Sequence, residues 1–354
     1  MSDFFKNLKV IEIASVLAGP SVGMFFSEMG SEVVKIENKK LNGDVTRSWK
    51  LASEDKTTKV SAYFCAVNYK KSYQFLDLTN AADLLDVKAQ INKADIVILN
   101  FKHGDDVKFG LDYESLSKTN SKLIYGTING FGQESERVAY DLILQAETGF
   151  MSMNGTSGSG PIKMPVALID VLAGHQLKEG LLVALIDRIK SEEGKKVSVS
   201  LYESAVASLA NQATNWLMGK HIAKPIGSTH PNISPYGELF TTGDGELITF
   251  AVGSNKQFSN LCEALGLIDL VADVKFKDNF SRVKNREELE DLISKKVIDL
   301  NSIDLITELH KKFVPVAKIN TIDEVFQNPM AKSMILHEDI GGVKTQRVKT
   351  VVFK

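Results

Sequence analysis

Apolar segments of strand length alternate with amphipathic segments of helix length in the first part of the chain. Residues 8–14 and 32–37 are rich in apolar side chains and predict strands. Between them, residues 20–30 begin at Pro20 and end at Gly30, which predicts a helix. Two strands joined by one helix in so short a stretch are typical of a βαβ unit in a parallel sheet.

The same alternation continues towards residue 218. Further strands are predicted at residues 73–76, 95–101, 122–129 and 196–201, and helices at residues 81–91, 113–117 and about 203–218. Residues 39–71 predict an extended loop with a short helix, and the glycine- and serine-rich residues 149–160 predict a mobile loop. The pattern as a whole predicts a doubly wound α/β domain.

The character of the sequence changes after residue 218. Residues 219–236 contain three of the eight prolines and no hydrophobic period, which predicts a linker. Residues 238–252 then show two strand patterns joined by Gly243, Asp244 and Gly245, which predicts an antiparallel hairpin. Helices predicted at about residues 255–265, 286–300 and 302–312 complete a smaller α+β domain.

Composition narrows the functional classes. The 354 residues are 44% hydrophobic and 24% charged, which is ordinary for a soluble globular protein. A formal net charge of −2 gives no reason to expect a nucleic acid or an anionic membrane surface as a partner. The first residues lack the long apolar stretch of a secretory signal, and no apolar run approaches the ~20 residues of a membrane helix.

Cysteine and histidine usage points away from metals and disulfides. The chain has two cysteines, Cys65 and Cys262, which are too few for a disulfide framework or a cysteine-based metal site. The six histidines are scattered without the spacing of metal ligands. We therefore expect a cytoplasmic protein without a bound metal.

One carboxylate stands out at the start of a predicted helix. Asp170 follows the apolar residues 164–169 and precedes a helical repeat of leucine and alanine, and the next basic side chain is Lys178. One interpretation is an N-cap, in which Asp170 accepts hydrogen bonds from the first free amides of the helix. The other is a nucleophile whose pKa is tuned by an apolar wall and a helix N-terminus.

Other candidate sites are weaker. Glu37 ends the second predicted strand, where dinucleotide-binding folds place an acidic residue, but residues 18–23 do not match GxGxxG and Pro20 removes one amide. The cations near the predicted strand ends, where open α/β sheets bind ligands, are Lys70, Lys71, Lys102, Lys108 and Arg137. Together they suit a phosphorylated ligand, although any one of them is equally compatible with a solvated surface.

Motifs in seven segments, in sequence order, resemble the family III CoA-transferases, a family that includes the α-methylacyl-CoA racemases. These segments are residues 8–37, the Gly43, Asp44, Thr46, Arg47 and Trp49 motif, and residues 68–77, 94–104, 124–132, 230–253 and 314–329. The resemblance implies a Rossmann-like large domain, residues 1–218, completed by about residues 325–354. It also implies a small domain at residues 237–324 and an obligate, interlocked homodimer.

The resemblance also implies a reaction and its residues. Asp170 matches the catalytic aspartate, which forms an anhydride and then a thioester while coenzyme A moves from an acyl-CoA donor to a carboxylic acid acceptor. Coenzyme A is thus a substrate, and no permanently bound cofactor is expected. The implied contacts with coenzyme A are Lys71, Asn100, Phe101, Lys108 and Arg137. The glycine-rich residues 155–160 are a hypothetical source of motion or of backbone amides.

Departures from the family pattern bear on the substrate. Asn38 and Leu17 replace an arginine and a glutamine of the formate/oxalate branch, so a less polar acyl group is expected near Leu17, and Trp49 is assigned to the same pocket. Racemases carry a histidine–aspartate pair where this chain has Tyr140 and Asp141. Because tyrosine, with a pKa near 10, is a poor base at neutral pH, we assign Tyr140 to a transferase site and keep racemisation at C2 as the alternative.

Overall fold

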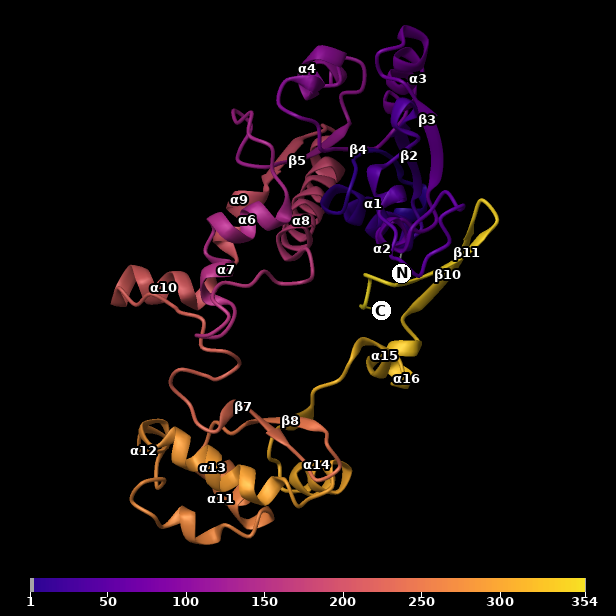
Figure 1. The fold of residues 1–354 in the computed structure, drawn as a ribbon. Helices are drawn as coiled ribbons and strands as arrows, with labels where there is room; N and C mark the ends of the chain where they lie inside the picture. Colours follow the sequence, from indigo (N-terminus) through magenta and orange to yellow (C-terminus); the bar gives the residue numbers. More distant parts are fainter. Residues whose placement is uncertain (1–2, 354) are drawn as a thin grey trace. The chain divides into compact units, whose positions relative to one another are not determined.

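The computed structural model describes residues 3–353, and they divide into two compact units (Figure 1). The larger unit comprises the chain up to Asn154, Ser159–Lys224, and the chain from Ser333 onward. The smaller unit comprises Gly155–Gly158 and Pro225–Lys332. The sequence predicted that the large domain runs to residue 218 and that the chain returns to it at about residue 325. The corresponding boundaries of the larger unit are Lys224 and Ser333. Within residues 3–353, no helix combines the length and the apolar character that crossing a membrane requires.

A six-stranded parallel sheet forms the centre of the larger unit, as the sequence predicted. Its strands are β1 (Lys9–Ile13), β2 (Glu32–Asn38), β3 (Ser72–Leu76), β4 (Ile96–Leu99), β5 (Ile124–Asn129) and β6 (Lys196–Ser200). The order β3-β2-β1-β4-β5-β6 places the direction change between β1 and β4. Ligands of doubly wound sheets bind at the carboxyl ends of the strands beside this change.

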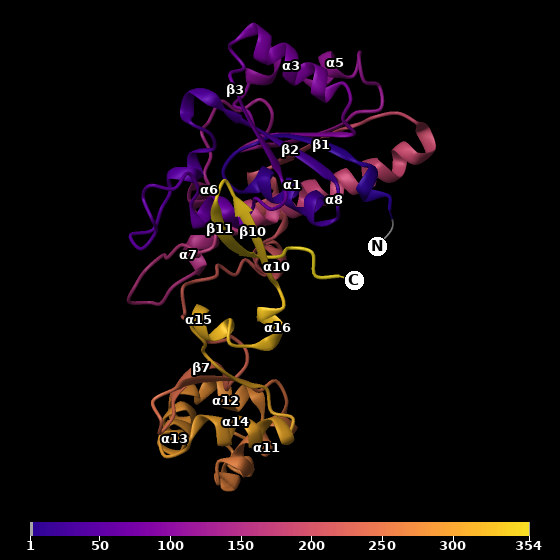
Figure 2. The same ribbon diagram turned by 90° about the vertical axis from the view of Figure 1, so that its right-hand side faces the viewer.

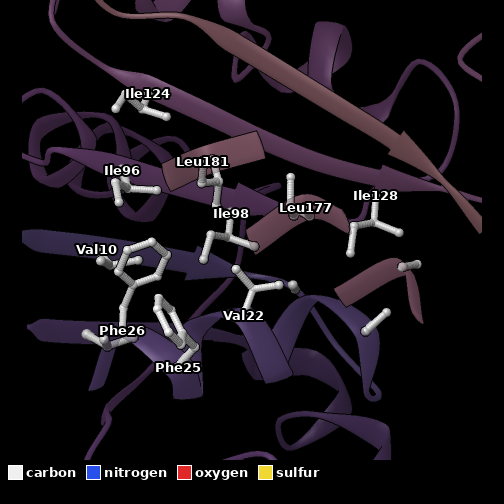
Figure 3. Close-up of a cluster of buried hydrophobic side chains, with 14 of the residues drawn as sticks. Val10, Val22, Phe25, Phe26, Ile96, Ile98, Ile124, Ile128, Leu177 and Leu181 are labelled. Atoms are coloured by element: carbon white, nitrogen blue, oxygen red, sulfur yellow. The ribbon is translucent and has the colours of Figure 1, made fainter. Parts of the chain in front are cut away.

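Helices cover both faces of the sheet (Figure 2). Helices α1 (Ala18–Glu28) and α8 (Leu168–Ser191) pack together on one face, and α3 (Ala81–Ile91) and α5 (Tyr113–Leu116) lie on the other. Figure 3 shows the core beneath α1 and α8. The side chains labelled there are Val10, Val22, Phe25, Phe26, Ile96, Ile98, Ile124, Ile128, Leu177 and Leu181. This packing fixes the ends of α1 and α8 relative to the strands.

Several elements differ from the sequence prediction. The helix predicted at about residues 203–218 is two helices, α9 (Leu201–Ala207) and α10 (Ala210–Gly219), because the chain turns at Ala210, where φ is 48°. The stretch predicted as a mobile loop contains α7 (Phe150–Met153). Other short helices of the larger unit are α2 (Ala62–Ala66), α4 (Asp105–Phe109) and α6 (Asp141–Glu147).

The end of the chain is attached to the larger unit. Strands β10 (Ile335–Ile340) and β11 (Val343–Val348) form an antiparallel hairpin, whose residues Ile340 and Val343 pack against Phe64 of α2. The backbone amide of Val351 then donates a hydrogen bond of 2.9 Å to Glu28 of α1. The larger unit is therefore built from both ends of the chain.

The smaller unit holds the predicted hairpin and one further strand. Strands β7 (Tyr236–Thr241), β8 (Leu247–Ala251) and β9 (Val316–Lys318) form an antiparallel sheet. The helices of this unit are α11 (Asn255–Ala264), α12 (Asn279–Lys284), α13 (Arg286–Val297), α14 (Ser302–Lys311), α15 (Ile322–Val325) and α16 (Pro329–Lys332). Phe240, Phe250 and Phe258 lie in its separate hydrophobic core.

Candidate functional site

Two cavities lie at the carboxyl ends of the central strands, within the larger unit. The first has a volume of about 270 Å³ and is lined by loops that follow β1, β4 and β5 and by Asp170 of α8. The second, of about 430 Å³, is lined by loops that follow β1, β2, β3 and β4. Four residues line both cavities: Ser15, Asn100, Phe101 and Lys102. The two cavities therefore adjoin at the point where the sheet changes direction.

Asp170 is buried beside the first cavity, and it does not cap its helix. The N-cap of α8 is Ala167, so Asp170 is the third helical residue, and the N-cap interpretation is wrong. Its exposed fraction is 8%, and its carboxylate makes no hydrogen bond with any residue between 3 and 353. An ionisable group in this position is available to a ligand in the cavity.

Helix α6 supplies the cap that Asp170 does not. Asp141 Oδ1 accepts a hydrogen bond of 2.7 Å from the backbone amide of Ile169, in the first turn of α8. Gln145 Nε2 donates to the other oxygen of Asp141 at 2.6 Å, while Gln145 Oε1 accepts from the amide of Met164 at 2.8 Å. These bonds fix the segment that enters α8 and therefore orient Asp170.

Burial and the nearby Asp141 carboxylate together raise the pKa of Asp170 to about 7. Burial has the larger effect, because the charged form loses its hydration, and the like charge of Asp141 adds to it. A carboxyl with this pKa is present in both protonation states near neutral pH. A perturbed pKa in a cavity is a feature of functional sites.

We predict that Asp141→Asn lowers the pKa of Asp170, because it removes the like charge while an amide oxygen still accepts from Ile169. The acidic limb of the pH profile of kcat/KM should move to lower pH, with activity at pH 6 about twofold higher or more. Glu179→Gln is the matched control: it removes an exposed acidic charge from α8, the helix of Asp170, and should leave the acidic limb unchanged. An unmoved limb in Asp141→Asn would contradict this electrostatic account.

Besides Asp170, five residues that the sequence assigned to the site line the cavities. Tyr140, Arg137 and Leu17 line the first cavity, and Asn100 and Phe101 line both. Tyr140 is 56% exposed at the N-terminus of α6, and its side chain caps no amide. Arg137 is ion-paired with Glu147, and its guanidinium lies 3.8 Å from the centre of the Phe131 ring.

The other predicted contacts with coenzyme A lie away from the cavity walls. Lys108, on α4, has its ammonium 5.3 Å from the ring of Phe109, which lines the second cavity. Lys71 is fully buried, with its ammonium 2.7 Å from Glu12 and 2.8 Å from the carbonyl oxygen of Pro20. Further acceptors are Val67 and Asn68, so the three protons of Lys71 are already used. The structure does not bring Lys71 to either cavity.

Trp49 is linked to the site through a tyrosine that the sequence analysis missed. The rings of Trp49 and Tyr63 meet edge to face, with centroids 5.1 Å apart. Burial raises the pKa of Tyr63, and the charges of Asp170, Asp141 and Asp44 raise it further. Tyr63 therefore lies within electrostatic reach of Asp170. No local motif distinguishes Tyr63 from any other aromatic residue of α2.

The second cavity is lined by two lysines that no sequence motif identified as part of the site. Lys40 lines this cavity and is ion-paired with Asp77 at 3.0 Å, and Lys102 lines both cavities. The sequence places Lys102 among several cations near predicted strand ends. Among residues 3–353, no group of three or more histidine, cysteine or acidic side chains could hold a metal ion.

Comparison with known sequences places the chain in a family. Residues 5–353 match CoA-transferase family III. The chain belongs to this family. A succinate–glutarate CoA-transferase of Agrobacterium fabrum is 38% identical over 94% of this chain and 84% of its own length. The succinyl-CoA:glutarate CoA-transferase of Mus musculus is 30% identical over 95% of this chain and 75% of its own length. The family and both relatives support CoA-transferase activity.

Solved structures agree with this assignment. A CAIB/BAIF family protein from Brucella suis has a TM-score of 0.86 and 35% identity, covering 99% of this chain and 92% of its own. The Mycobacterium tuberculosis protein Rv3272 has a TM-score of 0.83 and 25% identity, with coverages of 97% and 91%. The names of the relatives are those of transferases, which does not support the racemase alternative.

Proposed function

We propose that this family III CoA-transferase moves coenzyme A between carboxylic acids through a covalent intermediate on Asp170. The observation that carries the proposal is a buried carboxyl with no hydrogen-bond partner among the described residues, in a cavity and with a pKa of about 7. Such a group ionises near neutral pH and is a stronger nucleophile than an ordinary carboxylate, since it has lost most of its hydration.

The proposed steps conserve one activated acyl bond throughout. A carboxylate oxygen of Asp170 attacks the thioester carbonyl, and the thiolate of coenzyme A leaves, giving a mixed anhydride. The thiolate then attacks the aspartyl carbonyl, which releases the donor acid and forms an aspartyl thioester. Attack by the acceptor carboxylate and a second attack by the thiolate regenerate Asp170 and give the new acyl-CoA. Water must be excluded, because it would hydrolyse both intermediates.

The two adjoining cavities suit an extended substrate such as coenzyme A. In this proposal the thioester lies beside Asp170 and Tyr140, and the nucleotide end lies in the second cavity. There Phe101 and Phe109, with ring centroids 6.2 Å apart, offer apolar surface to the adenine. Lys40 and Lys102, with Arg137 at the first cavity, offer charge to the phosphates. We omit Lys71 from these contacts because its protons are used internally.

The acyl groups proposed are those of dicarboxylic acids of the size of succinate and glutarate. The names of the two relatives described above support this choice. Leu17 offers an apolar wall to the methylene chain of such an acid, and Trp49 packs on Tyr63 near Asp170. These contacts agree with the expectation of a less polar acyl group than formate or oxalate.

We further propose that the chain acts as an interlocked homodimer. Three consecutive large side chains on α10 support association, since Trp216, Leu217 and Met218 are 48%, 68% and 83% exposed. Exposed apolar patches of this kind mark protein–protein surfaces. A molecular mass in solution of twice 38.9 kDa would agree with the proposal, and a monomeric mass would contradict it.

Intact-mass analysis after incubation with succinyl-CoA tests the chemistry. The unmodified chain should gain a covalent adduct, and hydroxylamine should convert it to a hydroxamate at Asp170. Asp170→Ala should form no adduct and lose about 10⁴-fold or more in turnover. Asp187→Ala, a change at a half-exposed position on the same helix, should behave like the unmodified chain. Transfer retained by Asp170→Ala would overturn the proposal.

A further inference from the structure

The turn between β1 and α1 holds a valine in an unfavourable backbone conformation. Val16 has φ of 72°, in the left-handed region that β-branched residues avoid. A residue held there is strained, and it persists only where its surroundings impose that conformation. Val16 lines the same cavity as Asp170, so the strained residue forms part of the candidate site.

Side chains from two other segments hold this turn. Asn100 uses both ends of its amide on Ser15: Oδ1 accepts from the Ser15 amide at 3.0 Å, and Nδ2 donates to the Ser15 carbonyl at 2.8 Å. The amide of Val16 donates to both oxygens of Asp44, at 3.4 and 3.3 Å. Asn100 therefore holds the backbone polar groups of Ser15, and Asp44 holds the amide of the strained residue itself.

A buried network of charges holds Asp44 in turn. The ammonium of Lys35 lies 3.1 Å from Asp44 and 2.8 Å from Glu12, and it donates to the Ala14 carbonyl at 2.5 Å. Glu12 also pairs with Lys71, which donates to the carbonyl of Pro20 at the start of α1. The side chains of Glu12, Lys35, Asp44 and Lys71 are at most 1% exposed. Through the carbonyls of Ala14 and Pro20, the network contacts the backbone on both sides of Val16.

The two amides that follow Val16 have no acceptor in the described part of the chain. The backbone amides of Leu17 and Ala18 donate no hydrogen bond within residues 3–353, and both residues line the cavity of Asp170. They form the N-terminus of α1, which carries a partial positive charge. The carboxyl of Asp170, 8% exposed and without a hydrogen-bond partner among these residues, lines the same cavity. Two residues with unpaired amides and one with an unpaired carboxyl, among the described residues, thus line the same cavity.

We propose that Asp44 is a positioning residue that holds Val16 in its left-handed conformation, so that the Leu17 and Ala18 amides can stabilise the oxyanion of acyl transfer. The proposal rests on the covalent mechanism proposed above. When an oxygen of Asp170 attacks the thioester carbonyl, that C=O electron pair moves to oxygen. The resulting oxyanion accepts from these amides, and it collapses as the thiolate leaves. Asp44 itself contacts neither reacting atom.

A rescue experiment tests this role, with succinyl-CoA as the probe and the rate of adduct formation on Asp170 as the readout. Asp44→Ala should slow the adduct about 100-fold, while KM changes less than about threefold. Adding Val16→Gly should restore the rate to within about tenfold of the original, because glycine adopts positive φ without support. Asp44 also accepts from Thr46, but losing that contact would not be repaired by Val16→Gly.

Asp95→Ala is the matched control, because Asp95 also accepts from a backbone amide, that of Lys9, and pairs with Arg188. It lies at the opposite end of the sheet and should lower stability without slowing adduct formation. Should Asp44→Ala fail to fold, Asp44→Asn keeps an acceptor for Val16 and should slow the adduct about tenfold, with the same rescue.

An unchanged rate in the Asp44 variants, or a loss that Val16→Gly does not repair, would overturn the positioning role. These results are distinct from failure of the covalent mechanism, in which even the unmodified chain forms no adduct on Asp170.

Discussion

Asp170→Asn is expected to make the folded protein more stable at pH 8.5 while abolishing transfer. Burial and the charge of Asp141 raise the pKa of Asp170 from an ordinary value of 3.8 to about 7. The folded state therefore binds this proton more tightly than the unfolded state. The stability contributed by the protonated carboxyl is present below pH 4 and is lost as the pH rises through 7. Above pH 7 the ionised carboxyl costs about 4 kcal/mol at most.

Asparagine keeps the shape of the side chain and carries no charge at any pH. Its advantage in the free energy of unfolding should grow by about 2 kcal/mol between pH 5.5 and pH 8.5, measured by urea denaturation. Asp187→Asn, a change at a half-exposed position late in the same helix, should show no such gain, because the hydrogen bond from Lys195 holds the pKa of Asp187 below its ordinary value and the carboxylate is ionised at both pH values. An advantage that is equal at both pH values would mean that Asp170 is ionised with an ordinary pKa.

The hydrophobic pattern and the capping residues were sufficient to predict the longer helices and strands of the fold. Helix α3 begins and ends where the sequence predicted, because Asn80 caps it by accepting from the amides of Ala82 and Asp83. Helix α6 has seven residues and no side-chain cap, so its period is too short to detect. Strand β11 alternates between exposed and less exposed residues, but its two buried residues are Thr345 and Arg347, so the sequence shows no apolar alternation there.

The candidate site, like the fold, has features that the local sequence predicts and features that it does not. Asp170 was recognisable because a lone carboxylate follows an apolar run, yet its interaction with Asp141 comes from a helix distant in the sequence. The resemblance to the family III CoA-transferases implies a contact between Lys71 and coenzyme A, and the positive charge of Lys71 suits a phosphate. Glu12, on another strand of the sheet, pairs with that ammonium, and no local pattern reports such a contact. Pairings between strands are set by the topology, and local sequence does not encode them.

Lys35→Met is expected to destabilise the protein by about 3–5 kcal/mol, since removing one member of a buried ion pair leaves its partners uncompensated. Burial alone would lower the pKa of Lys35, but the charges of Glu12 and Asp44 outweigh it and the pKa is raised. After the substitution Glu12 still pairs with Lys71, whereas Asp44 keeps no cation within ion-pair distance among the described residues. The carbonyl of Ala14 also loses its donor.

Urea denaturation at pH 7 measures this loss, and Lys122→Met is its matched control. Lys122 also belongs to an ion pair of the larger unit, with Glu192 at 3.3 Å, but both side chains are more than half exposed. Exposed pairs contribute little because water screens them, so Lys122→Met should change the free energy of unfolding by less than about 1 kcal/mol. A similarly small loss in Lys35→Met would mean that Lys71 compensates both buried carboxylates. In that case the turn at Val16 would not depend on Lys35.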